Sequence, residues 1–154
     1  MRIKLLMSTL LLAGATAWAQ GVDHSILLNP PANSWPSYHG TYDGQRHSKL
    51  EQITPQNVHT LSMAWAFQTN GKIDIKSSPL LVDGVIYFTV PDNVWAIDAL
   101  SGHQLWHYTY PPNKGLHIGS RGVGMYKNWV YFLVPDGHLI SLNANDGSVH
   151  SLCV

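Results

Sequence analysis

The sequence predicts an all-β fold made of β-propeller blades, and three observations support this prediction. A pattern of strands and turns occurs twice, over residues 85–106 and again over residues 129–149. The copies are about 44 residues apart, which lies in the period range of propeller blades. Turn residues recur between the predicted strands, and no segment after residue 20 has the period of a long amphipathic helix. The clearest matches between the copies are Tyr87 with Tyr131, Pro91 with Pro135, and Gly102 with Gly147.

Each copy of the repeat predicts four antiparallel strands, which is the architecture of one blade. Asp83-Gly84 is a strong hairpin signal between the first two strands, and Gly102 supplies the positive φ of a tight turn. The first copy predicts strands at 77–82, 85–90, 93–98 and 104–110. The second copy predicts strands at 121–126, 129–134, 138–143 and 148–152. Because a blade cannot bury its apolar faces alone, the chain is predicted to be a piece of a larger array.

The first 19 residues have the three parts of a secretory signal peptide. Arg2 and Lys4 provide positive charge, residues 5–15 are apolar, and Ala17-Trp18-Ala19 is a cleavage signature. We therefore predict a signal peptide over residues 1–19 and a periplasmic protein. The apolar run is too short to span a membrane comfortably, so no integral membrane protein is expected after cleavage.

The rest of the chain before the repeats divides into two parts. Residues 20–60 show no hydrophobic period and predict an irregular N-terminal segment. Over residues 61–69, Met63, Trp65 and Phe67 alternate with other residues, which predicts one further strand.

Composition and spacing exclude several classes of function. Charged residues make up 12% of the chain and the formal net charge is +0, so no nucleic-acid partner is expected. Cys153 is the single cysteine, which excludes an intrachain disulfide. The nine histidines form no closely spaced ligand pair and are interpreted as turn and strand-end residues. Asp92, Asp98 and Asp136 lie at turns, where side-chain to backbone hydrogen bonds explain them better than acid–base catalysis.

Several motifs follow one another in an order typical of one family. Residues 96–106 carry the pattern Ala-x-Asp-x-x-x-Gly-x-x-x-Trp, which ends at Trp106. The other motifs are Trp35–Gly40, Gln45–Val58, Ser78–Tyr87 and Gly119–Gly122. Together they resemble the pyrroloquinoline quinone (PQQ)-dependent alcohol and aldose dehydrogenases, which are quinoprotein propellers. The resemblance covers nearly all of residues 35–150.

This resemblance implies an eight-bladed propeller, of which the chain is an N-terminal fragment with about two four-stranded blades. Residues 61–154 would form a partial propeller. It would consist of a strand at 61–69 that joins the last blade, a blade at 77–110 and an incomplete blade at 121–154. The resemblance also implies PQQ near the central axis, a calcium or lanthanide ion beside it, an alcohol or sugar substrate, and a cytochrome c acceptor. Because the family's metal ligands and catalytic aspartate lie in later blades, no catalytic or metal-binding residue is predicted here.

Two residues match positions at which the family binds its cofactor. Arg121 corresponds to an arginine that contacts the quinone, and a planar guanidinium suits carboxylate or quinone oxygens. Its alternative role is that of a structural arginine on a blade edge. Lys76 falls where many members place a cofactor-binding glutamate. It is a candidate to meet a quinone carboxylate, but because the charge differs in kind from the family's glutamate, a solvated lysine is the favoured interpretation. Neighbouring cysteines often precede the family arginine, whereas residues 115–118 here contain none.

The sequence therefore predicts the N-terminal part of an exported quinoprotein dehydrogenase that oxidises alcohols or sugars with PQQ. The fragment alone is expected to be inactive, so whether this chain is itself an enzyme stays open. The alternative is a non-enzymatic propeller scaffold of the cell envelope, which the absence of a cysteine after the signal and the segment from Trp35 to Trp65 both disfavour. Ser151 stands where the repeat predicts a tryptophan, and the end of the chain is interpreted as truncated or frameshifted.

Overall fold

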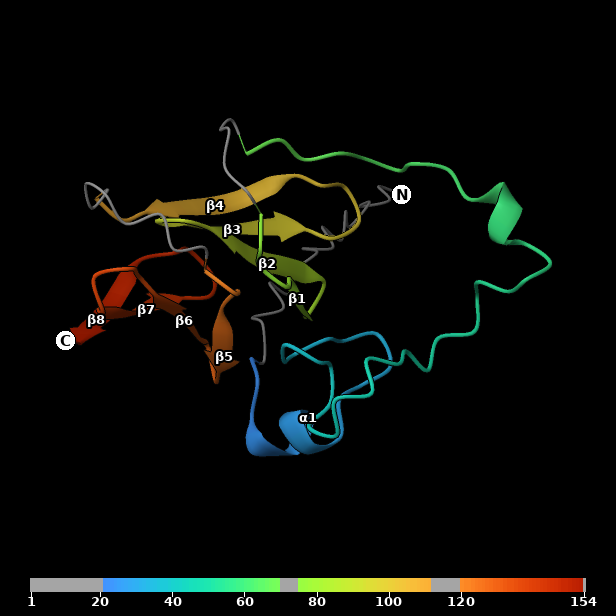
Figure 1. Ribbon diagram of the computed structural model, residues 1–154, viewed down its shortest axis with the longest axis horizontal. Helices are drawn as coiled ribbons and strands as arrows, with labels where there is room; N and C mark the ends of the chain where they lie inside the picture. The colour runs from blue at the N-terminus through green and yellow to red at the C-terminus, as the bar shows by residue number, and fades with distance from the viewer. Residues whose placement is uncertain (1–20, 70–74, 112–119, 154) are drawn as a thin grey trace, which may run out of the picture.

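The chain forms two four-stranded antiparallel sheets, as Figure 1 shows for the computed structural model, which describes residues 21–69, 75–111 and 120–153. The first sheet contains, in order, β1 (Leu80–Val82), β2 (Val85–Val90), β3 (Asn93–Asp98) and β4 (Gln104–Thr109). The second contains, in order, β5 (Gly124–Tyr126), β6 (Trp129–Leu133), β7 (Leu139–Asn143) and β8 (Val149–Cys153). Each strand pairs with the next one along the chain, which confirms the predicted all-β fold with one blade per repeat.

The two sheets share the details of their last turn. The pairing register shifts after Ala96 in β3 and after Ser141 in β7, just before each strand ends. The turns that follow contain Gly102 with a φ of 70° and Gly147 with a φ of 72°, a region that favours glycine. Asp98 Oδ1 accepts a backbone hydrogen bond within its turn, from the N–H of Ser101 at 2.7 Å. The interpretation of Asp98 as a turn residue is therefore confirmed.

The side chains that alternate along the strands give the first sheet two apolar faces. One face packs against the second sheet in a single buried cluster, to which Tyr87 and Ala96 contribute from the first sheet and Phe132 and Ile140 from the second. The opposite face carries a smaller cluster built around Trp95. The two sheets therefore pack face to face, as the repeat predicts.

Trp106, at the centre of β4, is the large side chain that joins the two sheets. It is 7% exposed, and its Nε1–H donates to the carbonyl of Ala144 at 2.8 Å. Its ring covers Gly147 so closely that a Cβ at this glycine would lie 2.7 Å from the ring. The turn glycine is thus required twice, because of its positive φ and because the indole occupies the space of a side chain.

Residues 61–69 are predicted to form a strand that joins the last blade, and this stays a prediction because the two described sheets do not include that blade. These residues pair with no strand among the described residues, although Trp65 and Phe67 are half-buried in alternation with exposed neighbours. Trp65 docks on the first sheet as Trp106 docks on the second, because its Nε1–H donates to Ala99 at 3.2 Å and its ring lies where a Cβ of Gly102 would be. A strand needs a backbone partner, and the resemblance places that partner in the last blade, which is not one of the two sheets described.

The segment expected to be irregular contains two short helices. Helix α1 (His24–Leu28) begins after Asp23, whose Oδ1 accepts the N–H of Ile26 at 2.9 Å, and η1 (Val58–Thr60) is a single turn. The chain between these helices forms turns and bends, and residues 45–69 run outside the two sheets (Figure 1). In the described part of the chain, no helix has both the length and the apolar character needed to cross a membrane.

Two residues of this segment attach it to the sheets. Val22 is fully buried, and its N–H donates to the carbonyl of Lys127, in the turn between β5 and β6, at 3.0 Å. Trp35 pairs with the outer edge of β1 through hydrogen bonds of 2.7 and 3.0 Å with Leu81. The N-terminal segment therefore contacts both blades.

Replacing Trp106 by alanine is expected to lower the free energy of unfolding by about 3–5 kcal/mol, since it opens a cavity between the sheets. Gly147→Ala should also destabilise the protein, because the new Cβ would meet the indole. Guanidinium unfolding followed by circular dichroism measures both effects. Leu100→Ala serves as the control, because Leu100 is 88% exposed and should change stability by less than about 0.5 kcal/mol. Equal stability of Trp106→Ala and the control would contradict the role of Trp106.

Candidate functional site at the start of the blades

The segments that precede β1 and β5 meet at one end of the two sheets. The N–H of Ser78 donates to the carbonyl of Arg121 at 3.0 Å. Gly122 permits this approach, because it has a φ of 130° and a Cβ there would lie 2.7 Å from the carbonyl oxygen of Ser78. Lys76 lies in the same segment as Ser78. The structure therefore places the two predicted site residues, Arg121 and Lys76, in adjoining segments.

Arg121 and Lys76 are both exposed cations. In the described ranges the one ion pair joins Asp136 to His138, so neither cation has a carboxylate within ion-pair distance there. Cationic groups that lack a protein partner favour an anionic ligand, and a guanidinium binds a carboxylate with two parallel hydrogen bonds.

Arg46 adds a third cationic group to this end of the molecule. Its guanidinium lies 5.2 Å from the centre of the Tyr38 ring, and its Nε donates to His39 Nδ1 at 2.8 Å. Hydrogen bonds from Ser78 and Arg46, with the nearby charges of Arg46 and Arg121, hold the pKa of Tyr38 below its ordinary value. A cavity of about 370 Å³ opens at these residues, and its wall includes Trp35, Tyr38, Arg46, Ser78, Leu81 and Ile86.

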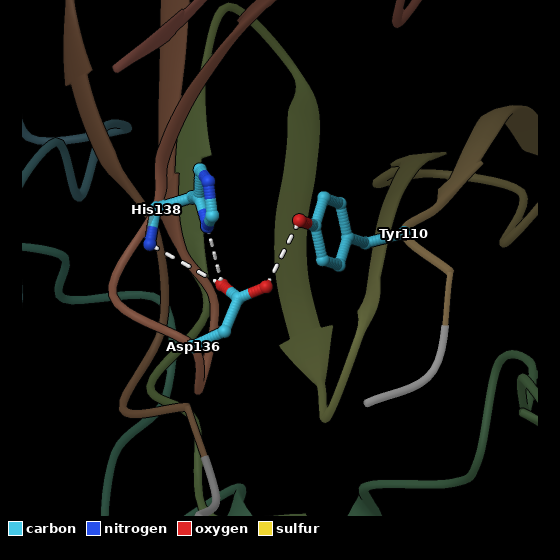
Figure 2. A network of polar contacts seen from close by, with 3 residues as sticks. All are labelled: Tyr110, Asp136 and His138. Carbon is cyan, nitrogen blue, oxygen red and sulfur yellow. Dashed lines mark hydrogen bonds and ion pairs between the residues drawn. The ribbon is translucent and has the colours of Figure 1, made fainter. Parts of the chain in front are cut away.

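Tyr110, Asp136 and His138 form a polar network between the two sheets (Figure 2). Tyr110 follows β4 and donates its hydroxyl to Asp136 Oδ2 at 3.0 Å. Asp136 Oδ1 accepts from His138 Nδ1 at 2.8 Å. Partial burial acts to raise the pKa of Asp136, but the hydrogen bonds from His138 and Tyr110 outweigh it and leave this pKa below its ordinary value. Asp136 is thus more than a turn residue, because its carboxylate ties the second sheet to the first.

Comparison with known proteins identifies relatives over most of the chain. A model of the PQQ glucose/ethanol/alcohol dehydrogenase β-propeller domain matches residues 35–151. Quinohemoprotein alcohol dehydrogenase ADH IIB of Pseudomonas putida is 36% identical over 152 residues, which is 91% of this chain. The solved structure of quinohemoprotein alcohol dehydrogenase ADHIIG from the same species matches with a TM-score of 0.80 and 32% identity over 88% of this chain. The solved structure of quinohemoprotein alcohol dehydrogenase from Comamonas testosteroni matches with a TM-score of 0.75 and 28% identity over 84% of this chain.

The chain belongs to the PQQ-dependent dehydrogenase propeller family. It spans 22% of the ADH IIB protein, 21% of the ADHIIG structure and 20% of the Comamonas structure. The predicted family and the predicted β-propeller fold are therefore confirmed. The chain corresponds to about one fifth of the length of each of these relatives.

The residues at this end of the blades are chemically suited to the quinone for which the family is named. PQQ carries several carboxylates on a flat ring system. Arg121 and Lys76 offer cations without a carboxylate partner among the described residues. Arg121 and Lys76 are thus the residues of this quinoprotein segment that could hold PQQ. No cluster of three metal-ligating side chains occurs in the described residues, so no metal ligand is assigned.

Sequence reasoning missed several polar residues at this end of the quinoprotein segment. Tyr38 and Arg46 lie in a loop, where hydrophobic periodicity gives no side-chain direction. Asp136 was interpreted from its turn alone, whereas its partner Tyr110 lies 26 residues away, directly after the last strand of the first sheet. The cysteine-free stretch at 115–118 and the signal sequence lie outside the described residues.

Asp136→Asn is expected to remove a pH-dependent contribution to stability. Because the folded-state pKa of Asp136 is lowered, the ionised carboxylate stabilises the fold above about pH 4, and this contribution is lost as pH falls through the lower folded-state pKa. The difference in unfolding free energy between wild type and Asp136→Asn should be positive at pH 6 and should shrink below pH 4. Urea unfolding at several pH values measures it, with Asp43→Asn in an exposed loop as the control. A difference that is the same at pH 3 and pH 6 would contradict this prediction.

Proposed function

We propose that this chain is the N-terminal part of an exported quinoprotein dehydrogenase that oxidises alcohols or sugars with PQQ as the electron acceptor. The observation that carries the proposal is the hydrogen bond between Ser78 and Arg121, because it joins two blades where both candidate cations lie. Membership of the family supplies the reaction class, and the unpaired charges of Arg121 and Lys76 among the described residues fit an anionic cofactor.

In the complete protein, each of these residues has a defined task. Arg121 would hold a carboxylate or ring oxygen of the quinone with its planar fork, and the bond from Ser78 holds the backbone from which it extends. Lys76 contributes a second positive charge at the same end, in place of the family's usual glutamate. The chemistry that PQQ supplies when bound is the acceptance of a hydride from the carbon that bears the substrate hydroxyl.

Other parts of the reaction belong to the rest of the protein. We expect the later blades to provide the ligands of a calcium or lanthanide ion, so residues 1–154 alone would not oxidise alcohols. A relative from Thauera butanivorans, 36% identical over 117 residues, is a 1-butanol dehydrogenase (cytochrome c), which supports a cytochrome c acceptor. A europium-containing methanol dehydrogenase, 26% identical with a TM-score of 0.73, supports a lanthanide or other metal ion in the full-length protein.

Arg121→Ala in the full-length protein is expected to weaken PQQ binding by about 1.5–3 kcal/mol, the scale of a charge-assisted hydrogen bond. Arg121→Lys should recover only part of this loss, because lysine lacks the planar fork. Titration of the apoprotein with PQQ, followed by quenching of tryptophan fluorescence, measures the affinity.

Lys49→Ala removes a different exposed cation and serves as the control for the change in net charge. Unchanged PQQ affinity in a folded Arg121→Ala protein would contradict the cofactor-binding role and favour the alternative, a structural arginine on a blade edge. If the wild type does not bind PQQ, a non-enzymatic scaffold becomes the better interpretation.

Export is expected to remove residues 1–19, because Ala17-Trp18-Ala19 matches the site that signal peptidase recognises. Mass spectrometry of the protein isolated from the periplasm should then show Gln20, free or cyclised, as the first residue. Substituting Ala19 by a bulky residue should block cleavage and serves as the control. Recovery of the intact N-terminus from the cytosol would contradict the proposed location.

A further inference from the structure

Thr89, near the end of β2, is a buried polar residue whose backbone and side chain both bind the site segments. It is fully buried. The hydroxyl of Ser77, beside Lys76, donates to its carbonyl at 2.7 Å, and its own N–H donates to the same Oγ at 3.4 Å. Its side-chain hydroxyl lies 3.1 Å from Ser120 Oγ, beside Arg121. Thr89 therefore connects the segment of one candidate cation to that of the other.

The direction of each hydrogen bond follows from the acceptors. A carbonyl can only accept, and each hydroxyl has one proton to donate. Ser120 Oγ uses its proton on the carbonyl of Gly122, at 3.2 Å. The proton between Thr89 and Ser120 therefore comes from Thr89, which is the side-chain donor to Ser120.

The Ser120 side chain holds the backbone immediately after Arg121, at Gly122. Its hydroxyl donates to the carbonyl of Gly122 and also accepts from the N–H of Gly122, at 3.4 Å. The carbonyl of Arg121 itself is held by the N–H of Ser78. The hydroxyl of Thr89 is the first, fully buried donor in this series of hydrogen bonds. Because it is buried, no water molecule can take its place as a donor to Ser120.

The second repeat shows that the blade does not need a hydroxyl at this position. Tyr87 and Pro91 match Tyr131 and Pro135, so Thr89 corresponds to Leu133. Leu133 ends β6 in the same strand arrangement, with an apolar side chain. The polar side chain of Thr89 therefore serves something other than the strand pairing that the two sheets share.

We infer that Thr89 is a positioning residue for Arg121. Through Ser120, its hydroxyl fixes the backbone that presents the Arg121 guanidinium to the carboxylate of the quinone. This inference rests on the proposed function, because it concerns the same ligand and the same arginine.

The test compares PQQ affinities of full-length apoprotein variants, measured by fluorescence titration with PQQ and calcium. Thr89→Val keeps the side-chain shape and removes the hydroxyl, and it should weaken binding about 3- to 10-fold. Thr89→Ser restores the hydroxyl and should return the affinity to within about 2-fold of wild type. Ser120→Ala breaks the same chain next to Arg121 and should weaken binding similarly, so it replaces Thr89→Val if that variant does not fold. Thr109→Val is the matched control, since the Thr109 hydroxyl binds Asn93 at the exposed end of β4.

A second measurement separates positioning from a general loss of structure. If Thr89 acts through Arg121, then Thr89→Val should have no further effect on PQQ affinity in the Arg121→Ala background. An equal loss in both backgrounds would overturn the inference, as would an unchanged affinity in folded Thr89→Val and Ser120→Ala proteins. Weaker binding in Arg121→Ala with unchanged binding in Thr89→Val would overturn the positioning role alone. Unchanged binding in Arg121→Ala would overturn the proposed cofactor site and the positioning role together.

Discussion

The packing of a tryptophan over a turn glycine is the interaction on which the rest of this structure depends. Trp106 fills the space between the sheets and bonds Ala144, while Gly147 lacks the side chain that would collide with the indole. Trp65 and Gly102 form the same contact one blade earlier. Each contact is apolar and carries one directional hydrogen bond, and the contact of Trp106 thereby fixes both the distance between the two sheets and their orientation.

This packing separates the two ends of the blades into different environments. The tryptophans dock at the end where β3 turns into β4 and β7 turns into β8. At the opposite end, where β1 and β5 begin, hydroxyls and cations gather instead, and Ser78 bonds Arg121 between blades. Because the apolar contacts hold the sheets together, the polar end can keep exposed charges without carboxylate partners among the described residues. Such charges stabilise a fold little by themselves and are better suited to a ligand.

The sequence predicted the parts of the fold that depend on local patterns. Alternation and turn residues located all eight strands of the two repeats to within a few residues, because side-chain period and turn chemistry are encoded locally. Over 61–69 the same alternation correctly indicated that Trp65 and Phe67 are half-buried, whereas Met63 is 82% exposed. The predicted strand requires a partner in the last blade and stays a prediction. The burial pattern depends on one face of the segment, whereas a strand requires a second backbone to pair with.

The sequence by itself determined the blade repeat, the family, and the identity of Arg121 and Lys76 as candidate ligands. Only the tertiary structure decided which residues support them. In the sequence, Thr89 has the features of an ordinary strand residue. Its hydrogen bond to Ser120, 31 residues away, forms only because the two sheets pack face to face. The network of Tyr110 with Asp136 and His138 arises in the same way. Local sequence sets the conformation of each strand, but contacts between blades depend on how the blades are placed relative to one another, which no local pattern specifies.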